Sequence, residues 1–311
     1  MGQVHQLVDQ HGKEVAANRL ETRRAARITR AAAASMSDEH MGEAATLIYS
    51  GWCHAGLPHR RTSNDQDWRI QTEYLTLVVE PGKIPNKDGS TTFIGVPYGP
   101  NARLILYYLM NRALETSSRT VTLGRNLTAF LARLGLSSGG KTHKAVREQV
   151  ERISRCRLTF HIEGKGRRGV ANQAIVDNAV FFDDGGEGDQ PALFSDTLHL
   201  SEGFYNHLRQ HNVALDERAI EKIHANSRAL DVYSWLAFRL HHLTDPVAVS
   251  WSALLPQFGG GITVKRNFRS VMKDDLLLAL SVYEKARVDI EERGITLYPS
   301  PPPVPRRPMV R

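Results

Sequence analysis

The order of elements expected between residues 101 and 182 constrains the fold of this 311-residue chain more than any other feature. Apolar spacing predicts three helices, and the period-two alternation of Leu158, Phe160 and Ile162 predicts a half-buried strand after them. A glycine-rich tip then turns the chain into a second strand that ends at 179–182. The helices are expected at about 101–114, 126–136 and 142–155, with a short strand at 120–123. Three helices followed by a β-hairpin indicate a winged helix.

The same order recurs in the second half of the chain. It comprises a strand at 198–200, a helix from Glu202, a long helix at about 219–243, a short helix at 252–258, a glycine breaker at 259–261, a helix at about 266–283, and strands at 287–290 and 295–298. We therefore expect an α+β protein built of tandem winged-helix domains.

The segments between these modules differ in composition. The expected organisation is a basic N-terminal arm at 1–44, helical or mobile, a first domain at 45–182, an acidic glycine-rich linker at 183–191, a second domain at 192–298 and a proline-rich basic tail at 299–311. The first domain begins with a strand and loop extension that contains apolar runs at 75–79 and 93–96.

Composition narrows the possible partners. Lys and Arg total 40 against 33 Asp and Glu, so the net charge is +7, which favours a polyanion. The chain has no apolar run of the ~18 residues that span a membrane, and its first residues lack the apolar core of a secretory signal. With only two cysteines, a disulfide framework is excluded. These features predict a cytoplasmic protein that does not associate with membranes.

The helix at 142–155 has one apolar and one basic side. Val146, Val150 and Ile153 fall on one side at 3.6 residues per turn. The predicted DNA-binding residues of this helix and its start are Lys141, Thr142, Lys144, Arg147, Glu148, Arg152 and Arg155. Such a helix suits the major groove, where Arg and Lys contact guanine edges and phosphates. A solvated charged face is the alternative interpretation.

The tip of the predicted hairpin is also basic. Lys165, Arg167 and Arg168 lie between glycines, where they are expected to neutralise phosphates or to form an ordinary exposed turn. From Ser137 to Gly169 there are nine Lys and Arg against three Glu, a net charge of +6. The second module repeats the pattern less strongly, because Leu277 shares the basic side of its third helix. Its predicted DNA-binding residues are Lys265, Arg266, Arg269, Ser270 and Lys273.

A different chemistry competes for the same segment. Residues 135–142, GLSSGGKT, match the phosphate-binding G-x-x-x-x-G-K-[ST] pattern, and AVFFDD at 179–184 resembles an apolar strand followed by a magnesium-binding acid. An ATPase would require a buried parallel strand before the loop, whereas residues 126–134 have helical spacing. We expect no nucleotide cofactor on this ground.

Metal and catalytic sites are not indicated. Cys53, His54 and His59 lack a paired C-x-x-C spacing, so no zinc is expected, and Cys53 suits a buried position. The chain has no histidine–apolar–histidine triplet for metal-dependent DNA nicking. We expect a binding protein that is not an enzyme.

Several long stretches together resemble the plasmid-encoded RepA family of theta-type replication initiators. They are GLPHRR at 56–61, VPYGPNARLILYYL at 96–109, LGRNLTAFLARLGL at 123–136, ALDVYSWLAFRL at 229–240 and SWSALLPQFG at 250–259. The resemblance covers about residues 46–299 and leaves out the N-terminal arm and the tail.

The resemblance implies a protein that binds repeated sequences, called iterons, in the double-stranded DNA of a plasmid origin. It also implies help in opening the duplex, association as dimers, and recruitment of the host initiator and the replicative helicase. It brings no catalytic residues. A winged-helix transcriptional repressor without an initiator role, and an ATPase using 135–142, remain the alternatives.

Overall fold

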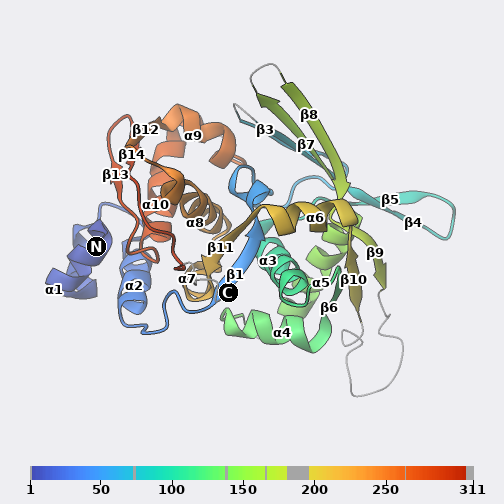
Figure 1. Ribbon diagram of the computed structural model, residues 1–311, viewed down its shortest axis with the longest axis horizontal. Coiled ribbons are helices and arrows are strands. Elements are labelled where there is room, and N and C mark those ends of the chain that lie inside the picture. The colour runs from blue at the N-terminus through green and yellow to red at the C-terminus, as the bar shows by residue number, and fades with distance from the viewer. Residues whose placement is uncertain are drawn as a thin grey trace, which may run out of the picture. The chain divides into compact units, whose positions relative to one another are not determined.

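The computed structural model describes residues 2–72, 75–136, 139–164, 167–180, 196–262 and 264–305 (Figure 1). The chain forms two compact units, each assembled from separate segments. We call Leu47–Gly51 with Leu57–Asn212 the central unit, and Met1–Thr46 with Trp52–Gly56 and Val213–Arg311 the terminal unit. Both combine helices with antiparallel sheets, so the predicted α+β class is confirmed.

The described part of the central unit contains four helices, which alternate along the chain with the strands of a three-stranded sheet. Its elements are α3 (Gly99–Glu115), β6 (Thr120–Thr122), α4 (Gly124–Arg133), α5 (Gly140–Arg155), β9 (Val176–Val180), β10 (Thr197–Leu200) and α6 (Glu202–Gln210). The strands lie in the order β6-β10-β9, with both pairings antiparallel. α3 is apolar nearly all round and is buried along most of its length, and α5 packs against it.

A second sheet of the central unit contains the predicted period-two strand. Its order is β2 (Trp68–Gln71), β3 (Leu75–Glu80), β7 (Arg157–Gly164) and β8 (Arg167–Ala174). Leu158 and Phe160 are buried while Thr159 is half-buried, as the alternation predicts. The prediction that the hairpin's second strand runs to 179–182 is wrong, because β8 ends at Ala174 and β9 joins the other sheet.

From α8 onward, the terminal unit repeats the series of one helix, one strand, two helices and two strands that builds the β6-β10-β9 sheet and its helices in the central unit. The elements of the terminal unit are α1 (Gln3–Arg19), α2 (Ala25–Met36), α7 (Glu217–Ile223), α8 (Ser227–Arg239), η3 (Leu240–His242), β12 (Val247–Ser250), α9 (Trp251–Phe258), η4 (Lys265–Asn267), α10 (Phe268–Leu280), β13 (Val288–Ile290) and β14 (Gly294–Leu297). The sheet order is β12-β14-β13, again antiparallel. The segments β1 (Ala45–Tyr49), η1 (Ser50–Cys53) and β11 (Asn212–Asp216) carry the chain from one unit to the other.

Two boundaries differ from the sequence-based expectation. The units divide at Asn212, not at 183–191, because β10 beyond that segment pairs with β6 and β9. Residues 183–191 themselves lie outside the described residues. The prediction of one long helix at 219–243 is wrong. The Asn226 side chain accepts hydrogen bonds from the N–H groups of Arg228 and Ala229, so α8 starts there as a new helix.

Candidate nucleic-acid interface

Helix α5 presents a basic outer face in the central unit. Its inner residues Val146, Val150 and Ile153 are at most 5% exposed. Lys141, Lys144 and Arg155 are exposed on the helix, while the other predicted contacts Thr142, Arg147 and Glu148 are half-buried. Gly139 precedes the helix, and no atom lies within 4 Å of a Cβ placed on Gly139 or Gly140. The first turn is therefore open, and its backbone N–H groups are accessible to an anion.

Two polar side chains fix α5 to the rest of its unit. The Gln149 Oε1 accepts the N–H of Tyr98 at 2.8 Å, and Gln149 is 3% exposed. Arg152 donates to the Val96 carbonyl at 3.1 Å, and its guanidinium lies over the Tyr98 ring, 5.1 Å from the centroid. Both residues thus hold the segment before α3 against α5.

The position of Arg152 differs from the prediction that it contacts DNA. It is 3% exposed, and it donates to Glu148 Oε1 at 2.9 Å as well as to the Val96 carbonyl. Arg61 lies 3.9 Å from the same Glu148 oxygen. The geometry assigns Arg152 to positioning the helix, and the Glu148 carboxylate is shared by two guanidinium groups. Helical spacing alone could not distinguish Arg152 from Arg155, because both lie on the basic side of the helix.

The predicted basic tip is only partly described. Lys165 lies outside the described residues, and Arg167 and Arg168 begin β8, in the sheet with β2, β3 and β7. The hairpin that pairs with β6 is instead β9–β10, whose connection falls at 181–195, also outside the described residues. The basic tip and the hairpin beside β6 are therefore two different structures.

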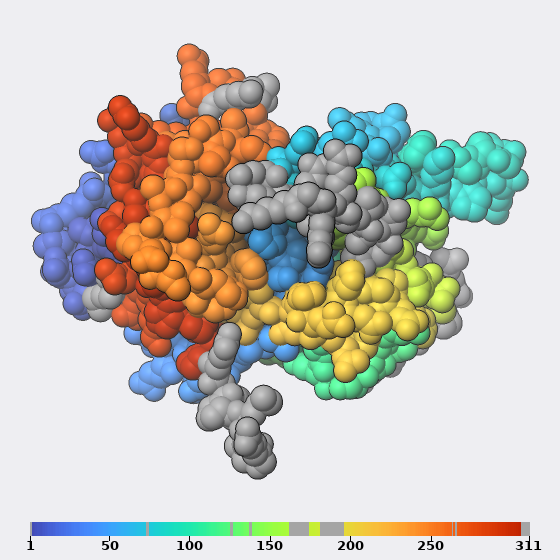
Figure 2. Space-filling model, turned by 45° about the horizontal axis from the view of Figure 1, so that its top comes forward, coloured from blue at the N-terminus to red at the C-terminus, as the bar shows by residue number. Residues whose placement is uncertain are grey.

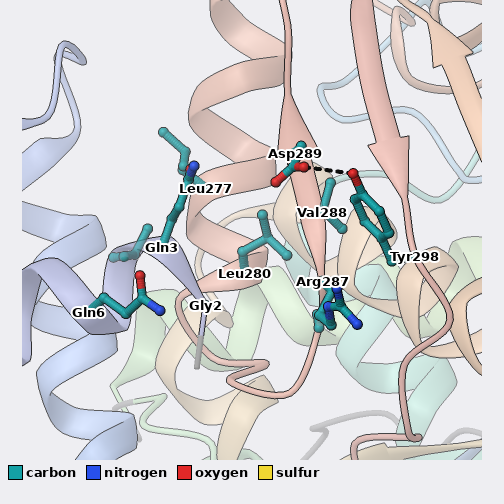
Figure 3. Close-up of a pocket in the computed structure, with 11 residues that line it drawn as sticks. Gly2, Gln3, Gln6, Leu277, Leu280, Arg287, Val288, Asp289 and Tyr298 are labelled. Carbon is teal, nitrogen blue, oxygen red and sulfur yellow. Dashed lines mark hydrogen bonds between the residues drawn. The ribbon is translucent and has the colours of Figure 1, made fainter. Parts of the chain in front are cut away.

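Helix α10 is exposed over its first turns only. Arg266, Arg269 and Ser270 are exposed and Lys273 is half-buried, while the side chain of Lys265 lies outside the described residues. Leu277, which shares this side, is 5% exposed. Figure 3 shows Leu277 and Leu280 facing Gln3 and Gln6 of α1 across a pocket of about 300 Å³. The N-terminal arm thus covers the apolar part of the face and leaves the basic part open.

A buried carboxylate organises the base of α10. Asp275 is fully buried and accepts hydrogen bonds from Arg24, the residue before α2, from Asn226 at 2.7 Å and from Arg228 at 3.0 Å. Arg228 also donates to the carbonyls of Phe258 at 2.8 Å and Gly260 at 3.3 Å, in the turn after α9. This network sets the turn before α10 relative to α8 and α2. Sequence reasoning missed it, because nothing near Asp275 in sequence indicates partners that lie 47, 49 and 251 residues away.

The phosphate-loop match has a different structural basis. Gly135 follows α4 with φ +81°, and the N–H groups of Gly135 and Leu136 donate to the carbonyls of Ala132 and Leu131, both at 3.0 Å. This is a helix C-terminal cap that needs glycine, not the end of a buried parallel strand. The strand context that nucleotide binding requires is therefore missing before residues 135–142, of which 137–138 lie outside the described part.

The two cysteines are buried. Burial raises the pKa of the Cys156 thiol to about 12, and it also raises the pKa of the Cys53 thiol. Both side chains are therefore held as thiols. Among the described residues, no group of three or more His, Cys, Asp or Glu side chains is placed to hold a metal ion. No described helix is long and apolar enough to cross a membrane.

Comparison with known proteins places the chain in a family. A family model described as plasmid encoded RepA protein matches residues 96–252, half of the chain. The chain belongs to this family of plasmid-encoded RepA proteins. The match spans α3 to β12 and includes three of the stretches that carry the resemblance in sequence. No curated protein matches the chain.

Solved structures extend the comparison to the fold. A crystal structure of selenomethionine derivatives of domains 2 and 3 of RctB is 13% identical and covers 80% of this chain and 97% of its own, with a TM-score of 0.52. A second crystal structure of RctB domains 2-3 is 12% identical and covers 79% and 94%, with a TM-score of 0.49. The first shows that this RepA-family chain shares its overall fold with two domains of RctB.

Proposed function

We propose that this protein is a plasmid replication initiator that binds repeated sequences in the double-stranded DNA of its plasmid's origin, without catalysing a reaction. The observation that carries the proposal is the exposed basic face of α5 in a chain of the RepA family. Lys141, Lys144 and Arg155 offer cations at the surface, while the inner face is fully packed. Such a helix can enter the major groove and contact guanine edges and phosphates.

The connectivity of both units supports tandem winged helices. In each, a helix, a strand and two further helices precede two strands of the same sheet, and the first strand pairs with the last; in the central unit β7 and β8 of the other sheet come before these two strands. In a winged helix the third helix of this series is the one that contacts DNA, which gives α5 and α10 that role. Two such helices in one chain suit a long recognition sequence.

The further steps follow from the family. We propose that the bound protein helps to open the duplex, associates with a second copy, and recruits the host initiator and the replicative helicase in the bacterial cytoplasm. These roles are tested by plasmid maintenance: an initiator supplied in trans supports replication of an origin-only plasmid, whereas a winged-helix repressor reduces transcription from its target promoter and supports no replication.

The deciding experiment is a salt-titrated binding assay with the full chain. The duplexes are the repeat-containing origin of its own plasmid and a scrambled sequence, each with and without ATP. We expect a preference for the repeats of about a thousandfold or more that ATP does not change. Equal affinity for the two duplexes would contradict the proposal, and a strict requirement for ATP would favour the ATPase alternative.

A further inference from the structure

The hairpin of β4 (Gly82–Pro85) and β5 (Thr91–Gly95) leaves the body of the central unit as a two-stranded ribbon. Figures 1 and 2 both show it projecting away from the helices of that unit. Every residue from 85 to 92 is exposed. A lone two-stranded hairpin is marginally stable in water, so its order must come from its tip and its base.

Hydrogen bonds among side chains order the tip. The Asn86 amide donates to Ser90 Oγ at 2.8 Å and to Thr92 Oγ1 at 2.9 Å. The Ser90 N–H and hydroxyl donate to Asp88, which lowers the pKa of that carboxyl. The turn is thus formed before any partner arrives, which reduces the ordering cost of binding.

Two glycines fasten the base of the hairpin to α5. Gly82 lies opposite Gly95 at the open end of the ribbon. A Cβ on Gly82 would come within 2.3 Å of Arg155 Cβ, and one on Gly95, whose φ is +80°, within 2.2 Å of Arg152 Nη1. These contacts require glycine at both positions. They fix the direction of the hairpin relative to the last turn of α5.

The ribbon carries two exposed ammonium groups. Lys83 lies in β4, with its Nζ 4.7 Å from the centroid of the Phe93 ring, and Lys87 lies in the turn. Neither forms an ion pair with another described residue. At the base, the exposed Arg155 adds a third cation. The ribbon therefore extends the positive surface of α5 outward.

We propose that the β4–β5 hairpin is a second DNA-contacting element, which lies along the phosphate backbone bordering the groove that α5 enters. The inference rests on the proposed function of α5. Four strand residues at about 3.4 Å each span about 14 Å, comparable with the major-groove width of about 12 Å. Lys87 is thereby carried from the end of α5 to the edge of the groove. Contacts of this kind add affinity but no sequence preference.

The test removes the hairpin charges from the full-length protein. For Lys83→Ala with Lys87→Ala, the slope of log affinity against log salt should fall by about 1.8, with a several-fold loss on both the repeat-containing and the scrambled duplex. Lys87→Ala alone, which breaks no ring contact, should lower the slope by about 0.9. The matched control is Lys13→Ala with Lys285→Ala, which removes the same charge from exposed positions of the terminal unit and should change the slope much less.

Two outcomes would overturn the inference. An unchanged slope, or a drop no larger than in the control, overturns it. A loss confined to the repeats would also overturn it, because it would mean base contacts. Arginine at both positions should retain the wild-type slope. If the wild-type protein itself shows no preference for the repeats, the proposed function fails, whereas a hairpin effect on both duplexes would still stand.

Discussion

The two units use the same order of elements but support their third helices differently. In the central unit, α5 is held from one side by Gln149 and Arg152, and its basic face is open. In the terminal unit, α10 is held by the buried Asp275, and the N-terminal arm covers its second half. One connectivity can therefore present either a long or a short exposed face, depending on what the surrounding chain packs against it.

The largest expected effect concerns the buried carboxylate. Asp275→Ala leaves the guanidinium of Arg228, whose side chain is only 11% exposed, without its charge partner and should destabilise the terminal unit by about 3 to 5 kcal/mol. Denaturant unfolding, followed by hydrogen exchange of the backbone amides in α10 and in α5, measures the loss of stability in each unit separately. Asp245→Ala, at an exposed position, is the control. A loss confined to α5 would contradict the described network.

The corresponding change in the central unit is Arg152→Ala. It removes the donor to the Val96 carbonyl and one partner of Glu148, and should cost about 2 to 3 kcal/mol. Protection of α5 against hydrogen exchange should fall, and DNA affinity should fall only as far as folding does. Arg155→Ala, on the exposed side, should weaken DNA binding and leave the hydrogen-exchange protection of α5 unchanged. If Arg152→Ala weakened binding with unchanged unfolding, Arg152 would be a DNA contact after all.

The predicted DNA contacts of the two helices can be compared with each other and with Arg167 of β8. Lys144→Ala and Arg147→Ala should each weaken binding to the repeats by about 1 to 3 kcal/mol if they contact bases. Arg269→Ala should cost about 1 kcal/mol, because α10 exposes a shorter face. Arg167→Ala should weaken repeat and scrambled duplexes alike. Equal losses on both duplexes for Lys144→Ala, Arg147→Ala and Arg269→Ala would show that neither helix determines the sequence preference.

The smallest effect should come from pH, and only in the terminal unit. Burial lowers the pKa of His5 on α1, against the opposing influence of Glu284. The folded state then binds the proton less well than the unfolded chain, so stability is present above about pH 6.5 and falls below it, by at most about 1.4 kcal/mol per pH unit. His5→Phe should reduce the difference in stability between pH 7.5 and pH 5.5, measured by hydrogen exchange of the backbone amides in α1. An identical pH dependence in the variant would exclude His5 as the cause.

Local patterns predicted the elements well. The period of Leu158 and Phe160 located β7, and the apolar spacing of 142–155 located α5 together with its buried side. The strands beyond β7 were misassigned because pairing is not local: β8 and β9 are separated by one residue, yet they belong to different sheets. The sequence contains no signal for that choice within either strand.

The candidate site was predictable in its charge but not in its geometry. Lys144 and Arg152 are alike in type and both lie on one helix, and only the fold buries the second. Leu277 shares a side of α10 with the second set of basic residues, but the fold buries it beside α1. The match to the phosphate-binding pattern at 135–142 is misleading for a different reason. Gly135 is required by the C-terminal cap of α4, and it also completes a short pattern that is typical of nucleotide binding.

The pairing of Arg24 with Asp275 has a consequence for how the molecule is made. The two residues are 251 positions apart, so on the ribosome the N-terminal helices emerge long before the helix they must pack against. The central unit, whose main segment is continuous from Leu57 to Asn212, is complete first. A nascent or truncated chain would therefore display α1 and α2 with their apolar sides unprotected, and the terminal unit can close only when synthesis is nearly finished.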